Sequence, residues 1–142
     1  MSARRFPVTQ DTLVWRSYDC FNRRDPEGAV ALYAPDCLWS FRHFPGWPDD
    51  PEYPGHDGLR KLFVDFLSAW GEFRITPLDL WGLGGDQWLV HCTMASKGAS
   101  SGVPVSMDMW QRCRAKRLIE LVDNYTDADD ALAAAGLSNA DL

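Results

Sequence analysis

The sequence predicts a single α+β domain in which N-terminal helices pack on a curved antiparallel sheet. Apolar residues follow a helical spacing in the first half of the chain, and between residues 72 and 126 they alternate with polar residues as strands do. Helices that precede an antiparallel sheet usually cover one of its faces. The 142 residues suit one domain, and 46% hydrophobic residues, with seven Trp, seven Phe and four Tyr, supply its core.

Three helices are expected in the first half of the chain. Residues 9–24 carry a helical apolar stripe, and Thr9 is a suitable N-cap. Asp25 and Pro26 are typical of the N-cap and first position of a second, short helix. Residues 57–70 repeat the helical spacing and end at a glycine, which predicts a third, amphipathic helix.

The remaining segments predict strands, one long loop and a final helix. Residues 37–41 form an apolar run of strand type, whereas residues 44–55 contain four prolines and predict a loop without regular structure. Four strand-like runs then follow one another across short turns, which indicates an antiparallel meander. Asp127 is a suitable N-cap for a C-terminal helix that ends before Gly136.

Composition argues against several partners. The chain has 14 Lys and Arg against 20 Asp and Glu, a net charge of −6, so it lacks the basic excess that nucleic acid requires. No uncharged run approaches the about 20 residues of a membrane-spanning helix, and the N-terminus does not resemble a secretion signal. We therefore expect a soluble, cytoplasmic protein with neither a nucleic acid nor a membrane as its partner.

Cofactor and metal motifs are missing from the sequence. It contains no glycine-rich nucleotide loop, no nucleophile elbow and no pair of histidines at metal-ligand spacing. The four cysteines stand apart, without a CxxC pair. We therefore expect buried, reduced thiols, no metal site and no cofactor.

Asp108 is the first candidate for chemistry because it lies inside an apolar strand. Alternation puts it on one face with Ser106 and Trp110. If that face lines a dry cavity, desolvation raises the carboxyl pKa and suits Asp108 to acid/base work near neutral pH. The alternative is an exposed aspartate, or one paired with Arg112 or Arg114.

His43 is the second candidate. It ends the strand-like run that starts at Trp39, and it shares a face with Trp39 and Phe41 at the start of the proline-rich loop. An imidazole at the rim of a pocket suits proton transfer. A solvent-exposed histidine at a strand end is the alternative.

The order of the elements and several phrases of the sequence resemble a known family. NRRDPEGAVALYAPDCLW, YPGHDGLRKLF, SGVPVSMDMW and ALAAAGL are similar to the SnoaL-like branch of the nuclear-transport-factor-2-like superfamily, which includes ketosteroid isomerase and polyketide cyclases. The resemblance spans roughly residues 8–137. It implies a cone-shaped fold for a single domain over residues 1–142, but not one function, because this scaffold hosts enzymes, binding modules and structural subunits.

The resemblance also bears on individual residues. SMDMW is similar to the strand that in ketosteroid isomerase carries its oxyanion-holding aspartate, which implies that role for Asp108. In contrast, Phe41 stands where that enzyme has its proton-shuttling aspartate, and Ser17 stands at its tyrosine, with Tyr18 one step away. Steroid isomerisation by the same mechanism is therefore not expected, whereas chemistry with one carboxylate and a histidine helper remains open.

The family register adds a third candidate acid. It turns Asp123 inward together with Leu121 and Tyr125, so that two acids would face one cavity and differ in pKa. The alternatives are a hydrated aspartate at a strand end and a core tyrosine. The same register turns Trp88 inward and His91 outward.

Aromatic residues on the predicted inward faces and the loop would suit a flat, apolar ligand, although an ordinary core has the same composition. We expect the ligand-binding residues to be Trp39, Phe41, Trp47, Tyr53, Phe63, Phe66, Trp88, Trp110 and Tyr125.

These observations favour a small-molecule-binding, cofactor-independent enzyme. It would catalyse an isomerisation, cyclisation, dehydration or hydration of an apolar cyclic or polyketide-like carbonyl compound, with Asp108 as the main acid/base group and His43 and Asp123 as auxiliaries. The alternative is a non-catalytic ligand-binding or structural module. A cavity of several hundred Å³ with Asp108 pointing into it would favour the enzyme. A filled core would favour the non-catalytic module.

Two further expectations concern surfaces. Leu89, Met107 and Met109 are expected to form an apolar patch on the sheet face opposite the cavity, and so to support a homodimer. The segment 44–55, with Trp47 and Tyr53, is expected to cover the mouth of the cavity.

Overall fold

A computed structural model describes residues 3–45, 47, 51–98 and 104–142, as four α-helices, one 3₁₀ helix and seven strands in that part of the chain. The helices are α1 (Leu13–Asn22), α2 (Pro26–Val30), α3 (Gly55–Ala69), α4 (Ala128–Ala134) and the 3₁₀ helix η1 (Asn139–Asp141). The strands are β1 (Arg4–Phe6), β2 (Tyr33–Ser40), β3 (Glu52–Pro54), β4 (Trp70–Gly84), β5 (Gln87–Gly98), β6 (Pro104–Ala115) and β7 (Ile119–Tyr125).

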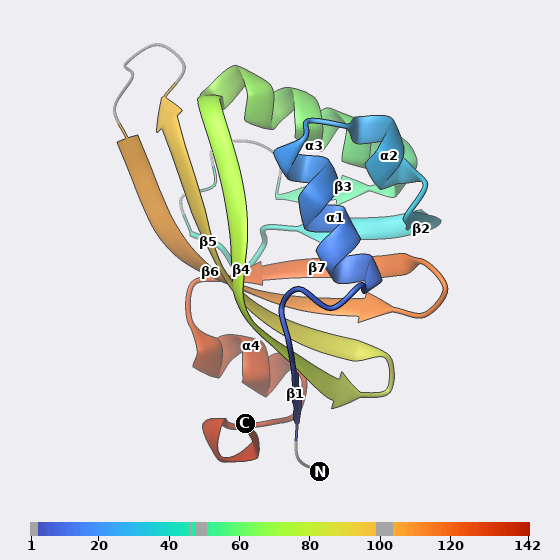
Figure 1. Cartoon of the computed structure of the whole chain (residues 1–142), viewed down its shortest axis with the longest axis vertical. Coiled ribbons are helices and arrows are strands. Elements are labelled where there is room, and N and C mark those ends of the chain that lie inside the picture. Colours follow the sequence, from blue (N-terminus) through green and yellow to red (C-terminus); the bar gives the residue numbers. More distant parts are fainter. Residues whose placement is uncertain (1–2, 46, 48–50, 99–103) are drawn as a thin grey trace.

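The strands form one curved sheet in the order β1-β4-β5-β6-β7-β2-β3 (Figure 1). Strands β4 to β7 make the antiparallel meander that the sequence predicts. The sheet as a whole is mixed, because β2 pairs in parallel with β7, with Trp39 opposite Val122. The predicted antiparallel sheet is therefore wrong at this one pairing. Here the chain leaves α2 and enters the sheet as β2, next to β7.

Both edges of the sheet carry short strands that were not predicted. At one edge β1 pairs with β4, and at the other Glu52–Pro54 pairs with β2. The second strand lies inside the predicted loop 44–55, and its one proline, Pro54, is tolerated because an edge strand needs partners on one side only. Residues 46 and 48–50 of that loop lie outside the described residues.

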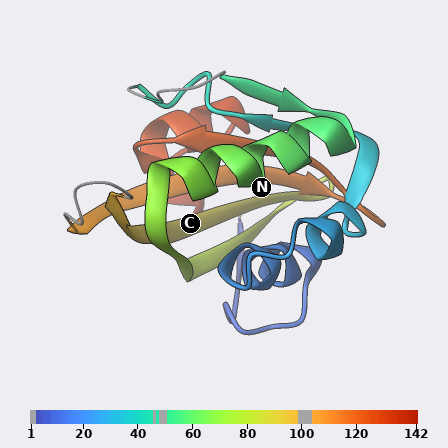
Figure 2. The same ribbon diagram turned by 90° about the horizontal axis from the view of Figure 1, so that it is seen from above.

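The helices lie on both faces of the sheet. Helices α1, α2 and α3 cover the inner, concave face, and α4 packs on the outer face (Figures 1 and 2). On the inner face Val90, Cys92 and Met94 of β5 join the main core, and Trp88 packs against it, as predicted. On the outer face Leu89 lies under α4 in a second, smaller cluster.

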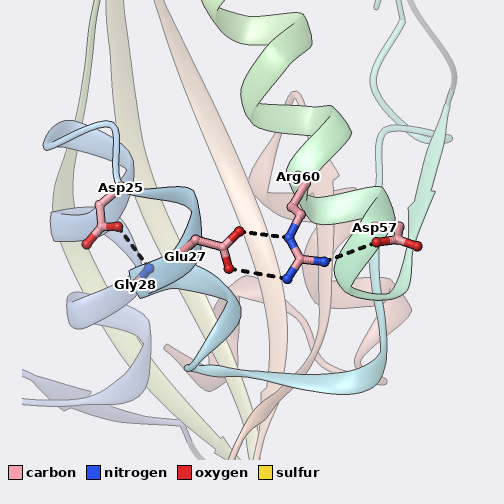
Figure 3. Close-up of polar contacts among 5 residues, drawn as sticks. All are labelled: Asp25, Glu27, Gly28, Asp57 and Arg60. Atoms are coloured by element: carbon pink, nitrogen blue, oxygen red, sulfur yellow. Dashed lines mark hydrogen bonds and ion pairs between the residues drawn. The ribbon is translucent and has the colours of Figure 1, made fainter.

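Helices α2 and α3 are joined by an ion pair at the surface (Figure 3). The Arg60 guanidinium donates to both carboxylate oxygens of Glu27 in α2, at 2.8 and 3.2 Å, and to Asp57 within α3 at 3.0 Å. Asp25 accepts the backbone N–H of Gly28 and so caps α2, as predicted. A side chain at residue 28 would collide with Asp25, since its Cβ would lie 2.2 Å from a carboxylate oxygen.

The end of α1 is tied to the edge of the sheet by Asn22. Its side-chain amide donates to the carbonyl of Ile75 in β4 at 2.9 Å and accepts the N–H of the same residue at 2.8 Å. The Asn22 amide therefore takes the place of a neighbouring strand at this position, and it holds the C-terminus of α1 against β4.

A chain of hydrogen bonds crosses the apolar core from α1 to β2. The Tyr18 hydroxyl donates to the side-chain carbonyl of Gln111 in β6. The Gln111 amide donates to Asn124 in β7 at 2.8 Å, and Asn124 donates to the backbone carbonyl of Ser40 in β2 at 2.8 Å. Tyr18, Gln111 and Asn124 are all buried, so each of these polar groups depends on its neighbour in the chain.

We predict that Tyr18→Phe lowers the free energy of unfolding by about 1–3 kcal/mol, because it leaves the buried Gln111 carbonyl without a donor. Removal of an exposed hydroxyl in the control variant Ser106→Ala should change stability by less than about 0.5 kcal/mol. Urea denaturation followed by circular dichroism measures both. Equal stabilities for Tyr18→Phe and the wild type would show that the chain of hydrogen bonds adds nothing.

Candidate functional site: the aromatic interior

Aromatic rings fill the space between α1, α3 and the inner face of the sheet. Phe21 of α1 stacks on Phe63 of α3, with centroids 4.4 Å apart and planes 8° apart, and lies 5.2 Å from Trp39 of β2. Phe66 of α3 lies 4.9 Å from Phe73 of β4. The helical and strand periodicities of these segments place the rings here, so that rings from α1, α3, β2 and β4 meet between the helices and the sheet.

Trp47 occupies one end of this interior. Its ring stacks on Phe41 with a centroid distance of 3.8 Å and an angle of 2°, and lies 5.3 Å from Phe66. The indole N–H donates to the Tyr53 hydroxyl at 3.2 Å, and that hydroxyl donates to Asp65 of α3 at 2.8 Å. Phe41 is fully buried beneath Trp47, which is partly exposed. The Trp47 ring therefore separates the core from solvent.

Among the described residues, two small hollows lie in the interior, each of about 10 Å³, which is space for about one water molecule. The inner hollow lies between α1, β2 and β6, and its lining includes Ser17, Tyr18, Tyr33 and Gln111. The second hollow is lined by Phe21, Arg24, Phe63, Phe66 and Phe73. In the part of the chain that the structure describes, the interior on the inner face is therefore filled mostly by its own side chains, and neither of these hollows is the large cavity that would favour the enzyme.

Two ionisable groups of the core stay protonated, Tyr18 beside the inner hollow and Cys92 of β5. Burial raises the pKa of Tyr18 well above its usual value and raises that of Cys92 to about 12. The Tyr33 hydroxyl accepts the indole N–H of Trp39 at 2.9 Å and is 2.6 Å from the Ser17 hydroxyl. These groups can donate or accept hydrogen bonds, but neither Tyr18 nor Cys92 is a base at neutral pH.

Asp108 does not point into the interior, and the prediction of its orientation is wrong. The side chain is 64% exposed on the outer face, where one carboxylate oxygen lies 3.3 Å from Nε2 of His91. Trp110 shares that face and stacks on His91 at 4.2 Å. Met109 and Gln111 turn inward instead, because Met109 lies opposite the inward-facing Cys92 of β5.

Asp123 is buried, as a catalytic carboxylate would be, but it also lies on the outer face. Tyr125 donates its hydroxyl to Asp123 at 2.7 Å, and Arg112 lies 3.5 Å from the same carboxylate oxygen. His43 is exposed and stacks on Tyr125 with centroids 5.0 Å apart. The structure thus brings His43, Tyr125 and Asp123 together, on the side of the sheet opposite the aromatic interior.

The hollow beside His43 is open to solvent and has a volume of about 460 Å³. Arg42, Tyr125 and Asp130 are among the residues that line it. The nearby carboxylate of Asp127 raises the pKa of Asp130. This hollow is a surface groove lined by both positive and negative side chains. The cavity expected around these residues was apolar.

The predicted apolar patch for a homodimer is not formed. Leu89 is covered by α4, and Met109 lies in the main core. The homodimer stays a prediction, but the apolar surface that was expected to support it is not found at these residues.

The remaining expected binding residues lie in the interior. Trp39, Phe41, Tyr53, Phe63 and Phe66 are buried in the main core. Trp47 and Trp88 are partly buried against that core. Their positions agree with the predicted faces, and their role in binding stays a prediction.

Comparison with known proteins identifies the family. The sequence matches the SnoaL-like domain over residues 14–123, which is most of the chain. This chain belongs to the SnoaL-like family. No curated protein sequence matches it.

Solved structures share the nuclear-transport-factor-2-like fold of this SnoaL-like chain. TerC, co-crystallised with polyporic acid, is 20% identical with a TM-score of 0.71 over 81% of this chain and 88% of TerC. A Catenulispora acidiphila protein with a ketosteroid isomerase-like fold, in complex with trimethylamine, is 15% identical, with a TM-score of 0.72 over 91% and 95% of the two chains. A Mycobacterium tuberculosis protein in complex with estradiol-17beta-hemisuccinate is 19% identical, with a TM-score of 0.69 over 82% and 92%.

Sequence reasoning missed two buried polar residues of this SnoaL-like domain, Gln111 and Asn124. Gln111 is followed by Arg112, and Asn124 is preceded by Asp123, so the local pattern gives no signal that would have found them. In the described residues no group of three His, Cys, Asp or Glu side chains is arranged to hold a metal ion. No helix in the same part of the chain is long and apolar enough to cross a membrane.

We predict that the two aspartates differ sharply in their effect on stability. Asp123→Ala should lower the free energy of unfolding by about 3 kcal/mol, because it leaves the largely buried Arg112 without its partner carboxylate. Asp108→Ala should cost less than about 1 kcal/mol, since the Asp108 side chain is 64% exposed. Thermal and urea denaturation of both variants give the comparison, and the reverse order would contradict the placement of the two side chains.

Proposed function

We propose that this SnoaL-like domain binds a flat, apolar small molecule on the ring of Phe41, in the place now taken by Trp47. The stack of Trp47 on Phe41, at 3.8 Å and 2°, is the observation that carries this proposal. This stack supports a planar ligand ring in the same position, because Phe41 already packs face to face against one ring. A ligand ring in that position would also meet Phe66 edge-on, as the indole does at 70°.

The energies involved allow a ligand to replace the indole. An aromatic pair contributes about 0.5–1.5 kcal/mol beyond its buried area, and the bond from Trp47 to Tyr53 adds a similar amount. A ligand that binds with a micromolar dissociation constant gains about 8 kcal/mol. A planar molecule with more than one ring therefore has enough binding energy to displace one partly exposed indole.

The ligands of two structural relatives support a ring-shaped molecule. TerC was crystallised with polyporic acid, and the Mycobacterium tuberculosis protein with estradiol-17beta-hemisuccinate. Both relatives share the fold at about one-fifth sequence identity, so they support the class of ligand and not its identity.

Binding is favoured over acid/base catalysis in the interior. Neither hollow is lined by a carboxylate or an imidazole among the residues that the structure describes. The Tyr18 hydroxyl has one proton, and it donates that proton to Gln111. A carbonyl ligand would receive this hydrogen bond only at the expense of a buried glutamine. The alternative of a non-catalytic ligand-binding module therefore has the stronger support.

We predict that Trp47→Ala increases affinity for the neutral fluorescent probe N-phenyl-1-naphthylamine about tenfold, because the probe no longer competes with the indole. Trp110→Ala is the matched control, since it removes a partly exposed tryptophan from the outer face and should leave affinity unchanged. Fluorescence titration measures both, with circular dichroism as a check on folding. A folded Trp47→Ala variant that binds no better than the wild type would overturn the proposal.

A further inference from the structure

The Tyr53 hydroxyl is the polar group that meets the edge of the Trp47 indole. Among the described residues, the indole packs against three rings, those of Phe41, Phe66 and Tyr53, and of these the tyrosine ring carries a polar atom. We infer that Tyr53 selects the ligand by accepting a hydrogen bond from it, so that the ligand class is a flat, apolar ring system with an N–H or O–H donor on its edge. This inference rests on the proposed function and adds the polar group of the ligand to it.

The chemistry of its partners fixes the direction of both hydrogen bonds at Tyr53. The indole nitrogen of Trp47 can only donate, and it lies 3.2 Å from the Tyr53 oxygen. An ionised carboxylate can only accept, and Oδ2 of Asp65 lies 2.8 Å from the same oxygen. Lys61 Nζ also donates to this carboxylate oxygen, at 3.0 Å. The single hydroxyl proton of Tyr53 therefore points to Asp65, and Tyr53 presents a lone pair to the position of the indole.

The Tyr53 ring is held by contacts that do not involve Trp47. Its backbone pairs with Trp39 where β3 joins β2. Its ring meets Phe41 edge-on, with centroids 6.1 Å apart and planes 84° apart, and Lys61 Nζ lies 5.1 Å from the ring centroid. The hydrogen bond to Asp65 ties the hydroxyl to α3. The acceptor is therefore positioned before a ligand arrives, and little ordering is needed on binding.

The displaced indole itself defines the room for a ligand. A bicyclic ring that replaces it on Phe41 needs only the space that the indole now fills. The edge of such a ring lies where the Trp47 N–H now lies, 3.2 Å from the Tyr53 oxygen. A donor at that edge therefore keeps the hydrogen bond that the indole makes, whereas a ring without a donor takes this bond away from Tyr53.

Burial turns this difference into selectivity. Tyr53 is only 1% exposed, so solvent does not readily replace a hydrogen bond lost from its oxygen. A site that hydrogen-bonds an N–H or O–H of its ligand rejects an analogue without that group, because its own buried polar atom loses a partner. A carbonyl or ether oxygen at the same edge is disfavoured further, since two acceptors would then face each other. Ring N–H compounds and phenols are therefore preferred over ketones and ethers.

The test compares indole with benzofuran, which has the same shape but an oxygen in place of the N–H. Isothermal titration calorimetry is carried out on Trp47→Ala, in which the place of the indole side chain is open to an added ring. This variant should bind indole about tenfold more tightly than benzofuran. Adding Tyr53→Phe should abolish the preference. Adding Tyr125→Phe instead should keep it, because that substitution removes a buried hydroxyl that also donates to a carboxylate but lies on the outer face.

The outcomes separate this inference from the proposed function. A Trp47→Ala variant that binds N-phenyl-1-naphthylamine but does not prefer indole over benzofuran overturns the inference about Tyr53 and leaves the proposed function standing. This comparison needs no second substitution, so it decides the matter even if Tyr53→Phe does not fold. A preference that survives Tyr53→Phe in a folded variant also overturns the inference. If all three compounds fail to bind folded Trp47→Ala, the proposed function itself fails.

Discussion

The structure depends on satisfying polar groups inside an apolar core. Tyr18, Gln111 and Asn124 are buried, and their hydrogen bonds run in one direction from α1 across β6 and β7 to the carbonyl of Ser40 in β2. Each group would be costly to bury alone. Because the chain of hydrogen bonds crosses strands that are far apart in sequence, it holds the parallel pair β2–β7 and the helix layer in one register.

This constraint also decides where the acidic residues lie. Residues an odd number of positions apart point to opposite faces of a strand, so the inward Gln111 turns Asp108 outward, and the inward Asn124 turns Asp123 outward. The outer face can accept both. Asp108 reaches solvent beside His91, and Asp123 pairs with Arg112 and Tyr125 beneath α4. The interior is left with aromatic rings and neutral hydrogen-bonding groups, and this suits binding better than proton transfer.

Periodicity and turn residues predicted most of the fold but not the orientation of two strands. The helices, the meander and the Asp127 cap of α4 follow from apolar spacing and capping residues near where they were expected, although α1 begins later than predicted and is capped by Thr12 and not by Thr9. Strand β6 has apolar residues on both faces, since Trp110 faces out and Met109 faces in, so alternation alone does not say which face is buried. Two long-range contacts settle that choice, the hydrogen bond of Tyr18 to Gln111 and the covering of the outer face by α4. Neither contact is visible in a local pattern. The short strand β3 was hidden for a similar reason, because proline-rich edge strands look like loops.

A crystal structure of the protein soaked with N-phenyl-1-naphthylamine is the most direct test of the central claim, that the aromatic interior is a binding site for a flat, apolar molecule. We expect the naphthalene ring on Phe41 and the Trp47 indole displaced from it. A naphthalene bound in the open hollow beside His43, with Trp47 still stacked on Phe41, would contradict the account.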